Sequence, residues 1–186
     1  MTAPTHLLTV LTPDQRGIIA GITALLDESD VHVLALSQTV VHDYFTVLVS
    51  VRAPDGTDVA ALRDGVHGVV GDLAAVTVVP HQPGATQEML GERYVLTATG
   101  RAVPGLVHTI SSVVAARGGN FTDLTSEVRG EQISIVAEID LPKDVALDQL
   151  QIDLQHATAH APLQVRLQHH RLFIATNEIA FRRVSP

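Results

Sequence analysis

HLLTVLTPDQRGIIAGITALLDESDVHVLALSQTVVHDYFTVLVSV, residues 6–51, is the stretch that decides the fold. Apolar residues fill 6–12, and a polar turn, 13–17, follows them. Residues 18–26 repeat apolar side chains at a 3.6-residue spacing, which predicts an amphipathic helix. The β-branched runs 31–41 and 44–51 predict two strands joined by a hairpin. The order is therefore strand, helix, strand, strand.

Alternation in the last of these runs predicts which face of a sheet each residue occupies. One face carries Phe45, Val47, Val49 and Val51, and the other carries Tyr44, Thr46, Leu48 and Ser50. In the helix, Gly21 has no side chain, so we expect it to let the helix lie close to the sheet.

A second helix and a fourth strand complete the unit. We expect Asp58 to be the N-cap of this helix. Gly65, Gly68 and Gly71 lie inside the predicted helix, which indicates either a weak or closely packed helix or a surface that another backbone approaches. Residues 76–79 are the predicted strand. The apolar residues expected on one helix face are Val59, Leu62, Val66, Val69, Val70 and Leu73.

The same pattern then recurs after a stretch rich in Pro, Gly and Gln. Gly17 and Gly105 are equivalent, an offset of 88 positions. Strands are predicted at 93–99, 120–128, 132–141 and 163–167, with helices beginning near Leu106 and Leu147. The predicted domains are 1–80 and 92–186, with a linker at 81–91. The second domain ends in a short helical tail with Leu172, Phe173 and Thr176 near one face.

Composition narrows the class of protein. The hydrophobic fraction of 46% is enough for real cores, and the net charge of −8 argues against a nucleic-acid-binding surface. Because the chain has no cysteine, disulfides, thiolate metal sites and thiol nucleophiles are excluded. No apolar run reaches 18 residues, and residues 1–6 do not resemble a signal peptide. We therefore expect a soluble cytoplasmic protein without a membrane span.

Three segments of the first repeat resemble the ACT domain family of small-molecule sensors: Asp14-Gln-Arg-Gly17 with the following Ile-Ile-Ala-Gly-Ile22, Leu36-Ser-Gln-Thr39 and Asp43-Tyr-Phe-Thr46. The closest branch holds small ACT proteins and the glycine cleavage system transcriptional repressor. The resemblance implies an α+β protein of two ferredoxin-like βαββαβ units, with antiparallel sheets and helices on one face of each. It also implies regulation by a bound amino acid rather than catalysis.

The turn at 14–17 has a physical reason to bind a small anion. Backbone N–H groups at a helix start lack partners and lie at the positive end of the helix dipole. An amino acid carboxylate fits there, and Asp14 is suited to accept from its ammonium group. The alternative is structural: Gly17 and Gly105 only permit the turns, and Asp14 is a capping residue. The second turn, at 103–105, lacks the acidic residue, so equal binding by both repeats is in doubt.

In many ACT sensors an Asn at the position of Asn120 bonds the ligand, and the first repeat has His32 or Val33 there. The alternative is a turn Asn next to Gly. We expect the ligand to bind between two units. Such a site would join the turn at residues 14–18 to Asn120, or the turn at residues 103–106 to Ser37. The candidate ligand-binding residues are Asp14, Gln15, Arg16, Gly17, Ile18, Ser37, Val103, Pro104, Gly105, Leu106, Asn120 and Phe121.

The sequence gives little support for metal binding or catalysis. His156 and His160 share a face of a predicted helix, and His169 is adjacent to His170. Neither pair has a Cys or acidic partner at a recognised metal-binding spacing, and the alternative is that these histidines are solvated. Neither a Gly-x-Ser-x-Gly nor a phosphate-binding Gly-Lys-Ser/Thr motif is present, so we expect no enzyme and no cofactor.

The partners that we expect are a free amino acid, with glycine or serine first, and a regulatory or enzyme protein. A homodimer is also expected, and no direct nucleic-acid contact. The alternative from another class is a ligand-free interaction module that docks an enzyme or forms oligomers through sheet edges.

Overall fold

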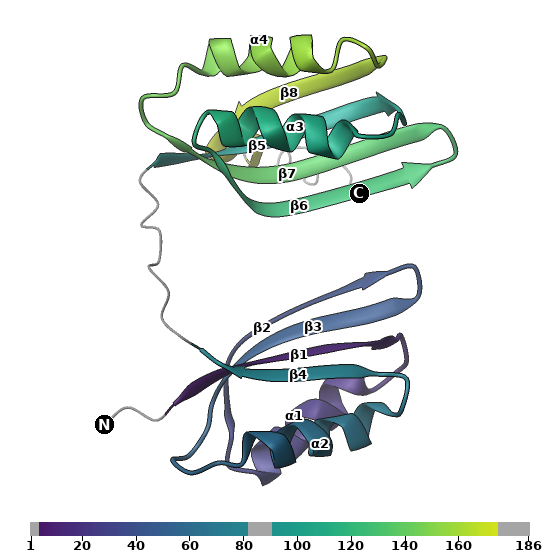
Figure 1. Ribbon diagram of the computed structural model, residues 1–186, viewed down its shortest axis with the longest axis vertical. Helices are drawn as coiled ribbons and strands as arrows, with labels where there is room; N and C mark the ends of the chain where they lie inside the picture. The colour runs from purple at the N-terminus through teal and green to yellow at the C-terminus, as the bar shows by residue number, and fades with distance from the viewer. Residues whose placement is uncertain (1–3, 82–90, 175–186) are drawn as a thin grey trace, which may run out of the picture. The chain divides into compact units, whose positions relative to one another are not determined.

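The computed structural model divides the chain into two compact units, residues 1–84 and 85–186. It describes residues 4–81 and 91–174. Each unit is a four-stranded antiparallel sheet with two helices over one face (Figure 1). The two predicted βαββαβ units are therefore confirmed. The predicted linker, 81–91, lies outside the described residues apart from its two ends.

The first unit follows the predicted order of elements. Its sheet has the strand order β2-β3-β1-β4, and every neighbouring pair is antiparallel. The side chains that alternate on β1 and β3 meet those of the two helices in one core, where Leu8, Ile22 and Val49 are fully or almost fully buried. The elements are β1 (Thr5–Pro13), α1 (Ile18–Glu28), β2 (His32–Val41), β3 (Tyr44–Arg52), α2 (Val59–Val70) and β4 (Ala75–Pro80).

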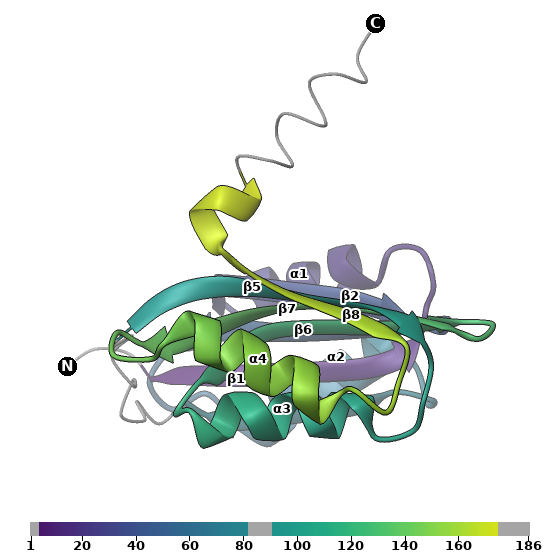
Figure 2. The same ribbon diagram turned by 90° about the horizontal axis from the view of Figure 1, so that it is seen from above.

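The second unit repeats this architecture with the strand order β6-β7-β5-β8. Figure 2 shows α3 and α4 running alongside each other over its sheet. Leu96, Ile110 and Leu154 lie in its core. The elements are β5 (Gly91–Arg101), α3 (Leu106–Ala116), β6 (Asn120–Arg129), β7 (Gln132–Pro142), α4 (Leu147–Ala157) and β8 (Leu163–His169). Residues 170–174 of the predicted tail are helical, whereas Thr176 lies outside the described residues.

The predicted offset of 88 positions is confirmed from the first strand to the second helix. A β-bulge occurs between Val33 and Ala35 on β2, and again 88 positions later between Phe121 and Asp123 on β6. The last strand is shifted by one more residue, because Val10 pairs with Val76 whereas Ala98 pairs with Val165. The two units are thus one fold with matched positions, which provides natural controls for mutagenesis.

The predicted apolar face of the second helix is partly wrong. Leu62, Val66 and Val70 are buried as expected, but Val69 is 42% exposed and Leu73 is 83% exposed. The helix ends at Val70 because Gly71, with φ of 90°, turns the backbone out of the helix. Gly71 is therefore the helix stop and not an interior residue.

The glycines of the first unit allow its two helices to pack closely. A β-carbon on Gly21 would lie 2.7 Å from Cγ1 of Val69, and one on Gly65 would lie 3.2 Å from Cδ2 of Leu25. The expectation that Gly21 faces the sheet is wrong, because it faces α2. For Gly65 the contact fits a closely packed helix, and it is a side chain, not another backbone, that approaches.

The outer edge of β8 is covered by one side chain from α4. Gln151 Nε2 donates to the Val165 carbonyl at 2.8 Å, and the Leu167 N–H donates to Gln151 Oε1 at 3.0 Å. These are backbone groups that another strand would otherwise pair with. The Gln151 amide thus closes the centre of this edge against strand addition.

We expect Gln151→Ala to lower the free energy of unfolding of the second unit by about 1–2 kcal/mol, because the Leu167 N–H and the Val165 carbonyl both lose their partner. Urea denaturation followed by circular dichroism measures the change. Gln155→Ala, an exposed residue one turn further along α4, is the matched control and should have little effect. Equal stability of the two variants would contradict a role for Gln151 at this edge.

Candidate functional site

The turn before α1 leaves the start of that helix uncapped. Gly17 is the N-cap, in the left-handed conformation with φ of 89° and ψ of 1°, and no side chain caps the helix. The first helical hydrogen bond runs from the Gly21 N–H to the Gly17 carbonyl at 2.9 Å. The N–H groups of residues 18–20 therefore have no acceptor within the helix. The result is a small patch of donors at the positive end of the helix dipole.

The turn is held in place from both sides. The Asp14 N–H donates to the Asp43 carbonyl in the β2–β3 hairpin at 2.8 Å, and Ile18 is buried in the core. Asp14, Gln15 and Arg16 are exposed between these anchors. The capping role considered for Asp14 is wrong, because Gly17 occupies the N-cap without a side-chain bond.

The second turn has the same backbone but different chemistry. Gly105, with φ of 86° and ψ of −2°, is the uncapped N-cap of α3, and the Ala102 N–H donates to the Glu131 carbonyl at 2.7 Å. Ala102 stands where the first unit has Asp14. Val103 is half-buried, Pro104 is exposed, and Leu106 is buried in the core. The second turn therefore offers the anion-binding donors without a carboxylate for an ammonium group.

Asn120 and Phe121 lie at the other end of their unit from the turn. Asn120 opens β6 opposite Asp140, whereas the turn follows Arg101, which is opposite Gln132. The eight positions between Asp140 and Gln132 on β7 span about 27 Å. One unit thus does not bring Asn120 to its own turn, so a site that joins them requires two units.

The two remaining candidate residues differ in exposure. Phe121 is half-buried against the core of the second unit, so its ring has a packing role. Ser37 is exposed near the middle of β2, opposite Leu48.

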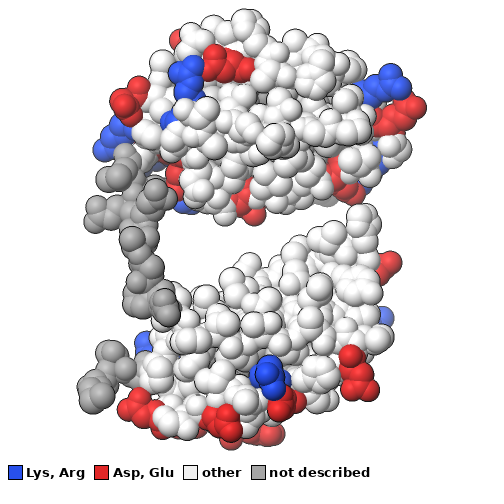
Figure 3. Space-filling model, viewed as in Figure 1, with Lys and Arg blue, Asp and Glu red and all other residues white. Residues whose placement is uncertain are grey.

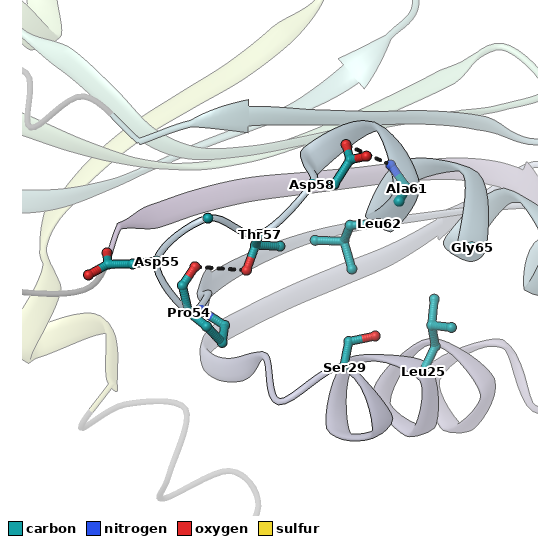
Figure 4. Close-up of a pocket in the computed structure, with 10 residues that line it drawn as sticks. Leu25, Ser29, Pro54, Asp55, Thr57, Asp58, Ala61, Leu62 and Gly65 are labelled. Carbon is teal, nitrogen blue, oxygen red and sulfur yellow. Dashed lines mark hydrogen bonds between the residues drawn. The ribbon is translucent and has the colours of Figure 1, made fainter.

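A shallow pocket of about 450 Å³ lies at the opposite end of α1 from the Gly17 turn (Figure 4). Sequence analysis did not identify it. Its polar groups are used locally: Asp58 Oδ1 accepts from the N–H groups of Ala60 and Ala61, and the Thr57 hydroxyl donates to the Pro54 carbonyl. Asp55 and Asp58 also disfavour an amino acid carboxylate. The predicted N-cap role of Asp58 is confirmed, and the pocket is a poor candidate for the ligand.

A second concave region, of about 600 Å³, lies between the outer side of α1 and the start of β2. It contains His32, which the register makes the first-unit counterpart of Asn120. The sequence left His32 and Val33 as alternatives at this position, and the register selects His32. The lining residues are Ala20, Thr23, Ala24, Asp27, Val31, His32 and Val33.

A buried hydroxyl lies one residue before the turn region. Thr12 is 1% exposed on the helix side of β1, and its Oγ1 has no hydrogen-bond partner within residues 4–81 and 91–174. Because an unpaired buried hydroxyl destabilises the fold, we expect Thr12→Val to raise the free energy of unfolding by about 1 kcal/mol. Thermal unfolding measures the change, with Thr9→Val on the opposite face of β1 as control. A less stable Thr12→Val variant would show that the hydroxyl is paired in solution.

The histidine arrangement differs from the prediction. His156 lies in α4, but the helix ends at Ala157, so His160 does not share a helical face with it. His169 and His170 each face a glutamate: their Nε2 atoms lie 3.9 Å from Glu92 and 3.4 Å from Glu138. Within residues 4–81 and 91–174, no three His, Asp or Glu side chains form a group able to hold a metal ion.

The family follows from both halves of the chain. A model of the ACT domain matches residues 5–79 and again residues 92–168. The chain belongs to the ACT domain family. Each match spans one of the two units, from its first strand to its last, so the protein carries two ACT domains in tandem.

Curated relatives are about one ACT domain long. A UPF0237 protein from Methanopyrus kandleri is 32% identical over 88 residues, which cover 98% of that protein and 47% of this chain. A UPF0237 protein from Methanosarcina mazei is 29% identical over 83 residues, 90% of its length and 44% of this chain. A third, from Clostridium perfringens, is 34% identical over 59 residues, covering 66% of its length and 31% of this chain.

Two solved structures share the tandem fold. An unknown protein from Galdieria sulphuraria matches with a TM-score of 0.74 at 14% identity, covering 90% of this chain and 98% of that one. A protein provisionally identified as a glycine cleavage system transcriptional repressor matches with a TM-score of 0.64 at 15% identity, over 89% and 96% of the two chains. At these identities the likeness concerns the fold alone.

No catalytic domain is indicated by the ACT match or by these relatives. Among the helices of the described residues, none has both the length and the apolar character needed to cross a membrane.

Proposed function

We propose that this tandem ACT protein senses a free amino acid and passes the bound state on to a partner protein. ACT domains are typically regulatory modules for small ligands, which sets the class of function. The observation that carries the proposal is the uncapped start of α1 behind Gly17, where three backbone donors remain for an anion. The amino acid carboxylate would bind these donors, as anions do at other helix starts.

The ammonium group of the ligand would be recognised by Asp14. This carboxylate is exposed and lies three residues before Gly17, and the backbone of its residue is fixed by the bond to Asp43. An amino acid carries a carboxylate and an ammonium group on the same carbon. Its carboxylate would accept from the N–H groups at the start of α1, and its ammonium would donate to the Asp14 carboxylate. Ala102 offers no equivalent in the second turn, so we propose that the first turn is the principal site.

The rest of the site would come from a second ACT domain. Since Asn120 lies at the far end of its own unit, it would complete a site only with the turn of another unit, and Ser37 would do so for the turn at 103–106. A ligand that contacts two domains favours the arrangement that brings them together by its difference in affinity. That arrangement would be the signal that the partner protein recognises.

Isothermal calorimetry of the full chain against the common amino acids tests this function. Glycine and serine are tested first, and a protein of similar fold is described as a repressor of the glycine cleavage system. We expect saturable binding of a small amino acid and no response to the matching amine or carboxylate alone. An absence of binding by every amino acid would contradict the proposal and favour its alternative.

The alternative is a ligand-free module that docks an enzyme or forms oligomers through sheet edges. The exposure of β2 favours it: every residue of His32–Val41 is exposed, and none is Asp, Glu, Lys or Arg. Long uncharged edges invite strand pairing. Of the other three edges, β8 is closed by Gln151, β6 carries Asp123, Glu127 and Arg129, and β4 is short and ends at Pro80, so β2 is the edge best suited to such pairing.

Two further expectations belong to the proposal. With a net charge of −8, the chain is expected to act without touching nucleic acid itself, and a mobility-shift assay with duplex DNA tests this. The cytoplasmic location expected from the sequence also stays a prediction.

A further inference from the structure

We propose that the open face of the β1–β4 sheet packs against the same face of a second copy of this chain. The open face is the side of that sheet turned away from α1 and α2. This self-association surface does not include the Gly17 turn, the proposed principal site, but it does include Ser37, the candidate residue for the turn at 103–106.

The open face of the first unit is large and apolar, and its one charged residue lies at the end of a strand. The alternation of β1 and β3, together with the strand register, places the odd-numbered residues of β1 and the even-numbered residues of β3 on this side. Val41 is 58% exposed and Tyr44 is 50% exposed there. Threonine, serine and alanine fill the positions between the large side chains, and Arg52, at the last position of β3, is the one charged residue of these described strands. The large exposed side chains are Leu11, Val41, Tyr44, Leu48 and Val79.

The corresponding face of the second unit is charged. Glu138 stands where the first unit has Ser50, and Asp140 stands where it has Arg52, with Arg93 lying 3.0 Å from Asp140 across the strands. Asp123 and Glu127 on β6 add to the charge of this face. Figure 3 shows the difference: around the β1–β4 unit, red and blue side chains gather over the helix layer and at the strand ends, while the sheet is white.

The difference in charge between the two open faces decides what packs against the β1–β4 sheet. The candidates are the open face of the second unit and a second copy of the first unit's open face. Packing the charged face of the second unit against the apolar face of the first would take Asp123, Glu127 and the Arg93–Asp140 pair out of water, which is unfavourable. A second copy of the open face brings only Arg52, at the end of β3, as a charged side chain. In a dimer with two-fold symmetry, the same surface patch of each copy forms the contact, so an apolar face packs against an apolar face.

The available area is sufficient for a specific contact. Strands about 4.8 Å apart and about 3.4 Å per residue give the four strands roughly 500 Å² of sheet, or roughly 1,000 Å² for two copies. Specific interfaces begin near that size. Two such sheets would pack about 10 Å apart with their strands about 30° from parallel, as in other sheet-on-sheet cores.

Sedimentation equilibrium of the full chain tests the proposal with a matched pair of variants. Leu48 and Val136 occupy equivalent positions, 88 apart, on the open faces of β3 and β7, and both are exposed. We expect the native chain at twice its mass of 19.8 kDa at micromolar concentration. Leu48→Lys should raise the dimer dissociation constant by about 100-fold or more, because each copy buries an unpaired charge. Val136→Lys should leave it unchanged.

Cross-linking provides a readout that does not depend on the lysine variants folding. The chain has no cysteine, so Leu48→Cys and Val136→Cys each introduce a single thiol. A short bis-maleimide should convert Leu48→Cys, but not Val136→Cys, into a covalent dimer. A monomeric native chain, a dimer unaffected by Leu48→Lys, equal loss of dimer in both lysine variants, or cross-linking only through Val136→Cys would each overturn the proposal.

Discussion

Replacing Gly17 by valine is expected to abolish amino acid binding while the chain stays folded. Gly17 has φ of 89°, which a β-branched residue adopts only at a cost of about 1–3 kcal/mol. No atom lies within 4 Å of a β-carbon at this position, so the effect is one of backbone conformation and not of collision. Relaxation of the turn would move the three N–H donors at the start of α1. Calorimetry measures the loss of binding, and circular dichroism shows that the fold remains.

Three variants make this prediction specific. Gly17→Asn is expected to keep the turn, because Asn tolerates the left-handed conformation. Gly105→Val introduces the same strain into the second turn, which lacks an acidic residue, and should change binding less. Asp14→Ala should weaken binding without changing the backbone. If a ligand binds the Gly17→Val and Asp14→Ala variants normally, the turn is only structural.

Replacing Gly100 by valine is expected to destabilise the second unit strongly. A β-carbon on Gly100 would lie 2.1 Å from the Pro162 carbonyl oxygen and 2.8 Å from the Leu163 Cα. Both are backbone atoms at the start of β8, so the collision can be relieved only by moving the strand. We expect the free energy of unfolding of the second unit to fall by about 3 kcal/mol.

Hydrogen exchange measured by mass spectrometry locates this effect. Amides of β5 and β8 should lose about 100-fold in protection, whereas those of β1 to β4 should keep theirs. Thr99→Val, at the neighbouring exposed position, is the control. In the first unit the matching position is Thr12, so a side chain is accommodated there, and the restriction is peculiar to the second unit. Unchanged protection in β8 would contradict the contact with residues 162–163.

The parts of the fold that follow local rules could be predicted from the sequence. Alternation in residues 44–51 assigned both faces of β3 correctly, and the two glycines 88 positions apart identified the repeat. The end of α2 was missed because the apolar spacing continues through Val69 and Leu73, whereas Gly71 turns the backbone away. The partner of Gly21 was missed because spacing along a helix does not say which neighbour faces a glycine.

In the candidate site too, features set by local sequence could be predicted, whereas contacts between distant residues could not. The turn at residues 14–18 is local, so its composition already indicated a helix start with unpaired donors. Gln151 reaches an edge strand fourteen residues away, and no local pattern marks such a contact. The sequence left His32 and Val33 as possible counterparts of Asn120, and the strand register selects His32. The charge contrast between the two open faces likewise needed the register of all four strands in each sheet.

The most direct test of the central claim, that a free amino acid binds at the start of α1, is a titration of the ¹⁵N-labelled full chain followed by two-dimensional NMR. Addition of the amino acid should shift the backbone amide signals of Gly17, Ile18, Ile19 and Ala20 saturably, with a common dissociation constant. The backbone amide signals of residues 55–58, which line the pocket, should move little. Saturable shifts confined to that pocket, or no saturable shift with any amino acid, would contradict the account.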